Sequence, residues 1–317
     1  MTLIQLKYIV AVDTYRHFAT AADHCFVTQP TLSMQISKME KELDVLIFDR
    51  SKHPVEPTEI GKKILVQARL ALNEANRIDE IVKASKGQVS GEFRLGIIPT
   101  VSPALLPRFL RKITNEYPDI HLRIEELQTD QILEKLDKDQ LDAGILATPL
   151  EKPRIIEKPI YYEPFMAYVP KGHRLENESF VLHSELQLRD ILLLKNGHCF
   201  RENVINLCDG AFPETGANPN NLLEFESGNF ETLIKLANQG FGMTLIPYLT
   251  ALDLNESDRA NLKPIDHPQP TREISLVYTR AQLKISIINI LEEEIKKLVP
   301  KKLLEKADSD LISPLHH

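Results

Sequence analysis

Length, composition and charge limit the class of protein to which this chain can belong. It has 317 residues, of which 43% are apolar and 26% charged, as expected for two or three globular domains. No apolar run approaches the roughly 18 residues that span a membrane, and the N-terminus lacks the features of a signal peptide. We therefore expect a cytoplasmic protein that does not contact membranes.

Charge is unevenly distributed along the chain. Residues 1–87 carry 12 Lys and Arg against 11 Asp and Glu, whereas the remainder is acidic and brings the net charge to -7. A near-neutral head on an acidic body favours a nucleic-acid-binding module joined to a separate sensor.

Residues 1–58 predict a winged helix-turn-helix domain. Thr28 can cap a helix whose first turn tolerates Pro30. Apolar residues then recur at helical spacing and form one stripe, made of Leu32, Ile36, Met39 and Leu43. Residues 48–57, with two prolines, are typical of a short hairpin or wing.

The opposite face of this helix is small and polar, as in a helix that enters the major groove of DNA. We expect four side chains near its N-terminus to face the bases: Gln29, Pro30, Ser33 and Met34. Lys38 and Arg50 are expected to contact phosphates, which position the protein without specifying sequence. The alternative for Lys38 is a solvated helix face.

Residues 59–87 predict a long linker helix, which Thr58 can cap. One narrow apolar stripe runs along it, formed by Ile60, Ile64, Ala68, Ala71, Ala75, Ile78 and Val82. Such a stripe favours a homodimer in which two linker helices pair, although it could also pack against its own domain. The following glycines, Gly87 and Gly91, predict a connecting segment.

From Glu92 onward, predicted strands and helices alternate as βαβαβ, which indicates a mostly parallel sheet covered by helices. A second such unit is expected over residues 162–268. We therefore assign residues 92–161 and 269–317 to sensor subdomain I and residues 162–268 to sensor subdomain II. Two α/β lobes leave a cleft between them, where ligands tend to bind.

The helix-turn-helix of residues 19–43, the wing at Arg50, the linker helix and the two-lobed domain resemble, in this order, the LysR-type transcriptional regulators. The resemblance implies a periplasmic-binding-protein-like sensor domain and a regulator rather than an enzyme. It also implies double-stranded promoter DNA and RNA polymerase as partners, and pairing of dimers into homotetramers. No cofactor or metal is implied.

One segment narrows the resemblance. Residues 197–202, with Cys208 nine positions after Cys199, are similar to the redox loop of the peroxide-sensing members of that family. Residues 98–101, 127–129 and 271–274 are similar to their peroxide-pocket segments. The resemblance implies a peroxidatic Cys199, a resolving Cys208 and a hydrogen peroxide pocket lined by Thr100, Thr129, His198 and Arg272.

The chemistry of such a site requires a thiolate, because the thiolate attacks peroxide. We expect the start of a helix at Cys199, with His198 and Arg201 nearby, to lower the pKa of Cys199. If residues 199–208 are helical, their ends lie roughly 13 Å apart. A disulfide needs about 4.4–6.8 Å between Cα atoms, so the segment must unwind, and cytosolic thiol reductants would reverse the change.

Several alternatives compete with this interpretation. A regulator of this family could instead respond to a small metabolite in the cleft, with incidental cysteines. A thiol peroxidase conflicts with the DNA-binding head, and a solute-binding protein with the absent export signal. Cys25 is expected in the core, His198 could ligate a metal with Cys199, and Thr100 and Thr129 could cap helices.

Overall fold

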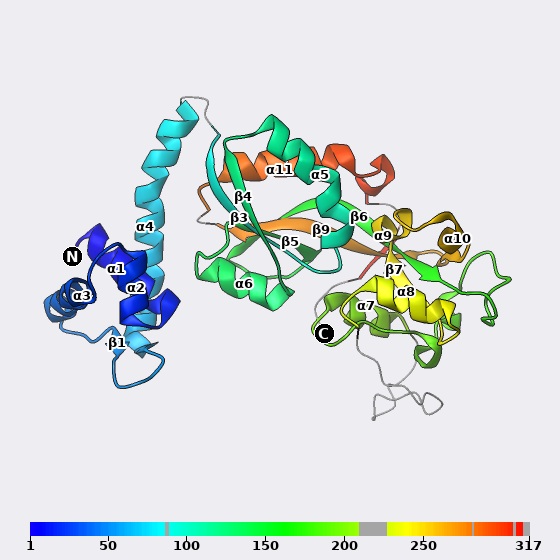
Figure 1. The fold of residues 1–317 in the computed structure, drawn as a ribbon, viewed down its shortest axis with the longest axis horizontal. Helices are drawn as coiled ribbons and strands as arrows, with labels where there is room; N and C mark the ends of the chain where they lie inside the picture. The colour runs from blue at the N-terminus through cyan, green and yellow to red at the C-terminus, as the bar shows by residue number, and fades with distance from the viewer. Residues whose placement is uncertain (86–88, 209–226, 281, 307–308, 313–317) are drawn as a thin grey trace. The chain divides into compact units, whose positions relative to one another are not determined.

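The computed structural model describes residues 1–85, 89–208, 227–280, 282–306 and 309–312. The chain divides into a first unit that contains residues 1–89 and a second unit formed by residues 90–280 and 285–317 (Figure 1). Each unit has its own core and is described separately. In the described part of the chain, no helix combines the length and apolarity needed to cross a membrane.

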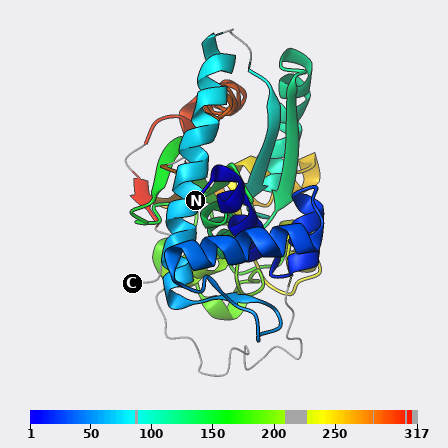
Figure 2. The ribbon, with the colours of Figure 1, turned by 90° about the vertical axis from the view of Figure 1, so that its left-hand side faces the viewer.

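The first unit contains three helices, a two-stranded hairpin and a long fourth helix (Figure 2). In chain order these are α1 (Leu3–Tyr15), α2 (Phe18–His24), α3 (Gln29–Leu43), β1 (Phe48–Asp49), β2 (Glu56–Pro57) and α4 (Glu59–Ser85). Thr28 caps α3 by accepting a hydrogen bond from the backbone of Thr31, as predicted. The hairpin pairs β1 with β2 in the predicted wing.

The predicted stripe of α3 is confirmed for three of its four members. Leu32, Ile36 and Met39 are fully buried in the core of the first unit, whereas Leu43 is 40% exposed. Leu43 is the last residue of α3, and Asp44 then adopts a left-handed conformation that ends the helix. The chain therefore turns before Leu43 reaches the core.

The stripe predicted along α4 is divided between the core of the first unit and the surface. Its member Ala68 is buried in that core and Ile64 packs against it, whereas Ile78 and Val82 are 64% and 45% exposed. Leu65 and Leu72, which are outside the stripe, are also buried, because they lie on an adjacent face of the same helix. Thr58 caps α4, accepting a hydrogen bond from Gly61 at 2.9 Å.

The second unit is built on a mixed sheet with strand order β4-β3-β5-β9-β6-β7. Its main strands are β3 (Gly91–Ile97), β4 (Ile120–Glu126), β5 (Ala143–Thr148), β6 (Ile155–Tyr168) and β9 (Gln269–Thr279). Helices α5 (Ser102–Glu116), α6 (Thr129–Asp137) and α11 (Ile285–Leu298) complete this lobe, and α5 packs on α11. Strands β3, β4 and β5 are parallel, as predicted.

The prediction of a mostly parallel sheet is wrong for the middle strands of this sheet. Strand β9 is antiparallel to both β5 and β6, because the chain returns from the second lobe in the opposite direction. The long β6 and β9 connect the lobes, and β9 begins at Gln269, earlier than the predicted Ile274. Short β10 (Ser309–Leu311), after η3 (Lys301–Leu303), runs parallel to β9.

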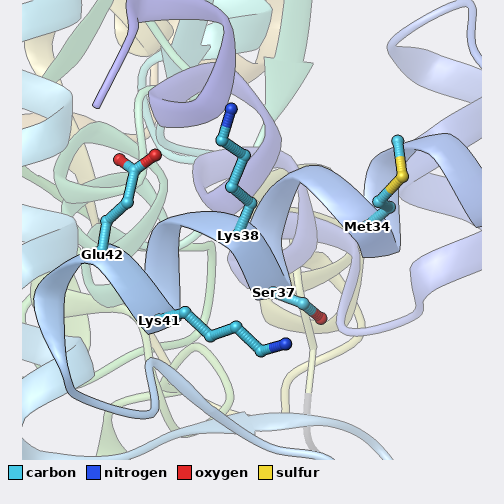
Figure 3. Close-up of a pocket in the computed structure, with 5 residues that line it drawn as sticks. All are labelled: Met34, Ser37, Lys38, Lys41 and Glu42. Carbon is cyan, nitrogen blue, oxygen red and sulfur yellow. The ribbon is translucent and has the colours of Figure 1, made fainter.

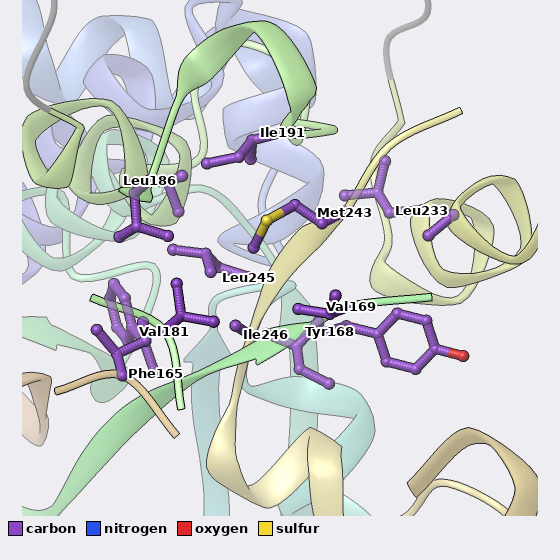
Figure 4. Packing of buried hydrophobic residues seen from close by; sticks show 14 of the residues in the cluster. Phe165, Tyr168, Val169, Val181, Leu186, Ile191, Leu233, Met243, Leu245 and Ile246 are labelled. Atoms are coloured by element: carbon purple, nitrogen blue, oxygen red, sulfur yellow. The ribbon is translucent and has the colours of Figure 1, made fainter. Parts of the chain in front are cut away.

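The second lobe also departs from the predicted βαβαβ unit. It contains η1 (His183–Glu185), η2 (Leu188–Asp190), α7 (Cys199–Leu207), α8 (Phe230–Asn238), β7 (Thr244–Pro247), α9 (Tyr248–Leu252), α10 (Glu256–Arg259) and β8 (Leu262–Pro264). Both β7 and β8 are antiparallel to β6, and parallel pairing occurs at isolated bridges such as Ile191 with Met243. Figure 4 shows the apolar core that holds these short segments together.

Candidate thiol site and DNA-binding face

The thiol site begins at a tight turn. Helix α7 begins at Cys199, as predicted, and Gly197 two residues earlier has φ +88°. A Cβ atom on Gly197 would lie 2.7 Å from Oε1 of Gln128, the residue that precedes α6. The left-handed backbone favours glycine here, whereas the amide of Gln128 is the end of a flexible side chain that could move aside.

Arg272 packs against Phe200 in the first turn of α7 and is only 1% exposed. Its Nη1 donates to the hydroxyl of Thr100 at 2.9 Å and its Nη2 to the carbonyl of Thr100 at 3.1 Å. Nη2 also donates to Oε2 of Glu163 at 2.8 Å, and the guanidinium lies 5.1 Å from the ring centre of Phe200. Neighbouring groups thus fix this buried cation in place.

The pKa of Cys199 differs from the sequence-based prediction. Burial raises it above the ordinary value of a cysteine, and this effect exceeds the opposing charge of Arg272 and the hydrogen bond with Thr129. The backbone N–H of Phe200 at the helix start lowers it, as predicted, but by less. At neutral pH the thiol form of Cys199 therefore dominates.

The expected contributions of His198 and Arg201 are not found. Burial lowers the pKa of His198, so its ring is neutral near pH 7, and its Nε2 has no hydrogen-bond partner among the described residues. Arg201 donates to the carbonyl of Leu194 at 2.9 Å. Arg272 is instead the cation whose charge lowers the pKa of Cys199.

Cys208 lies at the other end of α7. It is 7% exposed and, with Phe200 and Val204 on the same side of the helix, packs into the core of the second lobe. Phe200 itself contacts Phe165, with ring centres 4.6 Å apart. No disulfide joins Cys199 to Cys208, and the helix between them separates their Cα atoms by roughly 13 Å.

The two threonines do not cap helices. Val101 occupies the N-cap position of α5 and Gln128 that of α6, so Thr100 and Thr129 are free of this role. The side chain of Thr129 instead forms a hydrogen bond with Cys199. The hydroxyl of Thr100 accepts a hydrogen bond from Arg272. Cys25 follows α2 and packs against the core of the first unit.

The exposed face of α3 carries the side chains predicted to contact DNA. Gln29, Pro30, Met34 and Lys38 are exposed, and Ser33 is partly exposed. Figure 3 shows Met34 and Lys38 along one ridge of α3, with Ser37 and Lys41 along the next. These residues border an open depression on the helix surface.

Arg50 is held against the same helix. Its guanidinium donates to Ser37 at 3.0 Å and to the buried carboxylate of Glu40 at 2.9 Å, and lies 5.1 Å from the ring centre of Phe18. The side chain remains 40% exposed. Its position is therefore fixed by the protein before any DNA is bound.

Comparison with known protein families agrees with this arrangement. The model of the LysR substrate binding domain matches residues 86–296, and that of the bacterial regulatory helix-turn-helix protein of the lysR family matches residues 3–62. The chain belongs to the LysR family.

Individual LysR-family proteins are similar along most of the chain. It is 36% identical over 278 residues to the hydrogen peroxide-inducible genes activator of Pectobacterium carotovorum subsp. carotovorum, covering 88% of this chain and 90% of that protein. A full-length OxyR variant from Pseudomonas aeruginosa matches with TM-score 0.80 and 31% identity, covering 97% of this chain and 99% of that one. A hydrogen peroxide-bound OxyR mutant from Corynebacterium glutamicum matches with TM-score 0.58 and 29% identity, covering 94% and 92%.

Sequence reasoning missed Glu163 in this LysR-family site. Glu163 is a single acidic residue among the apolar and aromatic residues 160–168, a pattern that can indicate a buried ion pair. Its partner became visible only in the register of β6 and β9, where Glu163 lies opposite Arg272. Gln128 and Phe200 lie in the segments 127–129 and 197–202 that the resemblance singled out, but their contacts with Gly197 and Arg272 were not predicted.

Proposed function

We propose that this LysR-family chain is a cytoplasmic transcription activator that responds to hydrogen peroxide through Cys199. The observation that carries the proposal is the environment of that sulfur. Cys199 lies at the start of α7 with the hydroxyl of Thr129 bonded to it and the charge of Arg272 acting on it, while a second thiol closes the same helix. The peroxide-related names of the similar proteins support the same ligand.

The first chemical step is oxidation of Cys199. Its deprotonated sulfur attacks one oxygen of hydrogen peroxide, the O–O bond breaks, and the other oxygen leaves as hydroxide and takes up a proton to form water. The sulfur becomes a sulfenic acid. Thr100 and Thr129 offer hydroxyls to the peroxide, and Arg272 stabilises the negative charge that develops on the leaving oxygen. The neutral ring of His198 completes the proposed pocket.

The second step joins the two ends of α7. The thiol of Cys208 attacks the sulfenic sulfur, a disulfide forms and water leaves. Because a disulfide requires Cα atoms about 4.4–6.8 Å apart, α7 must unwind and withdraw Phe200 and Val204 from the core. The oxidised and reduced sensors therefore differ in shape, and cytosolic thiol reductants reset the protein.

The readout of this switch is promoter DNA bound by the first unit. The exposed face of α3 supports contact with the major groove. The exposed Ile60, Ile78 and Val82 of α4 support a homodimer through this helix. We further propose that dimers pair into homotetramers and that RNA polymerase is the partner activated at the promoter.

Replacing the reactive sulfur tests the proposal. In Cys199→Ser, peroxide should no longer alter transcription or the DNA footprint, while DNA binding by the reduced protein should remain. Cys25→Ser is the matched control and should respond as the wild type does. A full peroxide response in Cys199→Ser would reject the sensor role and leave a LysR-family regulator with another inducer.

A further inference from the structure

Phe26 is an unusual residue in the first unit. It lies in the turn between α2 and α3, and its side chain is 95% exposed. It is not among the residues that pack against the core of that unit. A large aromatic side chain in this position contributes almost nothing to the folded state by burial.

The backbone at Phe26 is also unfavourable for this residue type. Its φ is +55°, in the left-handed region that bulky side chains rarely adopt. The N–H of Phe26 donates to the carbonyl of Asp23 and the N–H of Val27 to that of Ala22, both at 3.1 Å. This pair of bonds forms a Schellman motif, in which the position held by Phe26 strongly prefers glycine. Stability therefore does not explain a phenylalanine here.

The position of Phe26 in the motif suggests what the ring contacts. Thr28, the cap of α3, follows two residues later, and Gln29 and Pro30 at the start of α3 are exposed. When the N-terminal end of a recognition helix enters the major groove, the turn before it runs beside the DNA backbone.

We propose that Phe26 is a DNA-contacting residue whose ring packs against the deoxyribose carbons of the strand beside the groove entered by α3. The inference rests on the proposed DNA binding of the first unit. The left-handed turn places the ring outside the core of the first unit before any DNA is bound. The contact is uncharged, and it therefore adds affinity without releasing counterions.

A glycine substitution separates a role in DNA binding from a role in folding. In full-length Phe26→Gly, relief of the left-handed strain should raise the thermal midpoint of unfolding by a few degrees. DNA affinity should nevertheless fall about tenfold, as expected when one apolar side chain no longer packs on the DNA. Asp44→Gly is the matched control, because exposed Asp44 ends α3 with φ +54°. It should gain stability without losing affinity.

The probe is a double-stranded DNA selected from a random library by the wild-type chain. Affinity is measured across a series of salt concentrations, where Phe26→Gly should give a line parallel to that of the wild type. Phe26→Asn, which tolerates the left-handed turn, should lose affinity in the same way.

Unchanged affinity in both Phe26 variants would overturn the proposal, and so would a lowered thermal midpoint in Phe26→Gly, which would make the ring structural. A wild-type chain that selects no duplex would instead overturn DNA binding by the first unit, and the role of Phe26 with it.

Discussion

Arg272 and Glu163 form an ion pair across the adjacent strands β9 and β6, with 2.8 Å between Nη2 and Oε2 and each side chain only 1% exposed. Glu163 also accepts a hydrogen bond from the backbone of Leu249 at 2.8 Å. A buried charge without a partner is costly, so each member of the pair depends on the other. The pair holds Arg272 near Cys199 while offsetting part of its positive charge.

Removing the charge of Glu163 should make Cys199 more reactive. Burial keeps the pKa of Cys199 above its ordinary value, so the rate of thiol alkylation rises as pH increases toward that pKa. In Glu163→Gln the charge of Arg272 is no longer offset, the pKa of Cys199 falls, and the rise in alkylation rate moves to lower pH. The substitution should also reduce the free energy of unfolding by roughly 3 kcal/mol, because Arg272 remains buried without its carboxylate partner.

The matched control is Asp142→Asn, which removes the carboxylate paired with Arg94 in the other lobe at 3.1 Å. It should lower stability but leave the pH profile of Cys199 alkylation unchanged. A profile that moves equally in both variants would mean that loss of stability, rather than local charge, alters the thiol.

Removing Arg272 should have the opposite effect on chemistry. In Arg272→Ala the leaving oxygen of peroxide loses its cation, so oxidation of Cys199 should slow by roughly 10²-fold in stopped-flow measurements. The double variant Arg272→Ala with Glu163→Gln avoids an unpaired buried carboxylate and should be equally slow. Restoration of the wild-type rate in the double variant would show that the loss came from misfolding.

Lys38 should act on DNA as a point charge. Its side chain is exposed on the face of α3 that also carries Met34 (Figure 3). In Lys38→Ala, binding should weaken for all duplex sequences. The slope of log affinity against log salt should decrease by about 1 for each phosphate that is no longer neutralised. A weaker affinity confined to one base position would instead make Lys38 a reader of sequence.

The exposed apolar face of α4 should be required for dimerisation. Ile78→Glu places a charge on that face, which would be buried between paired helices, and should shift the protein to monomers in analytical ultracentrifugation. Val66→Glu is the control, because Val66, 37% exposed, lies on a different face of α4. Dimers that persist in Ile78→Glu would place the interface elsewhere.

The elements that sequence predicted well are those with local signals. Caps such as Thr28 and Thr58, the apolar stripe of α3 and the helix start at Cys199 depend on residues within a few positions of one another. The spacing of these residues along the chain was therefore enough to predict where these helices begin and which side of α3 is buried.

The elements that sequence missed depend on pairing between distant segments. The antiparallel placement of β9 between β5 and β6 joins segments more than 100 residues apart, and it alone brings Glu163 opposite Arg272. The pKa of Cys199 was predicted to fall because neighbouring charges are visible in sequence, whereas burial of the sulfur is a property of the fold. The sequence also showed the apolar residues of α4, but not which of them are buried in the core and which are exposed.

The most direct test of the switch is a peptide map of the full-length chain before and after a modest excess of hydrogen peroxide, with free thiols alkylated before digestion. We expect both cysteines of α7 to be alkylated in the untreated chain. After treatment, a crosslinked peptide joining Cys199 to Cys208 should appear, with loss of helix over Cys199–Leu207 in hydrogen exchange. Both thiols remaining reduced after treatment, or a crosslink that forms while α7 stays protected, would contradict the account.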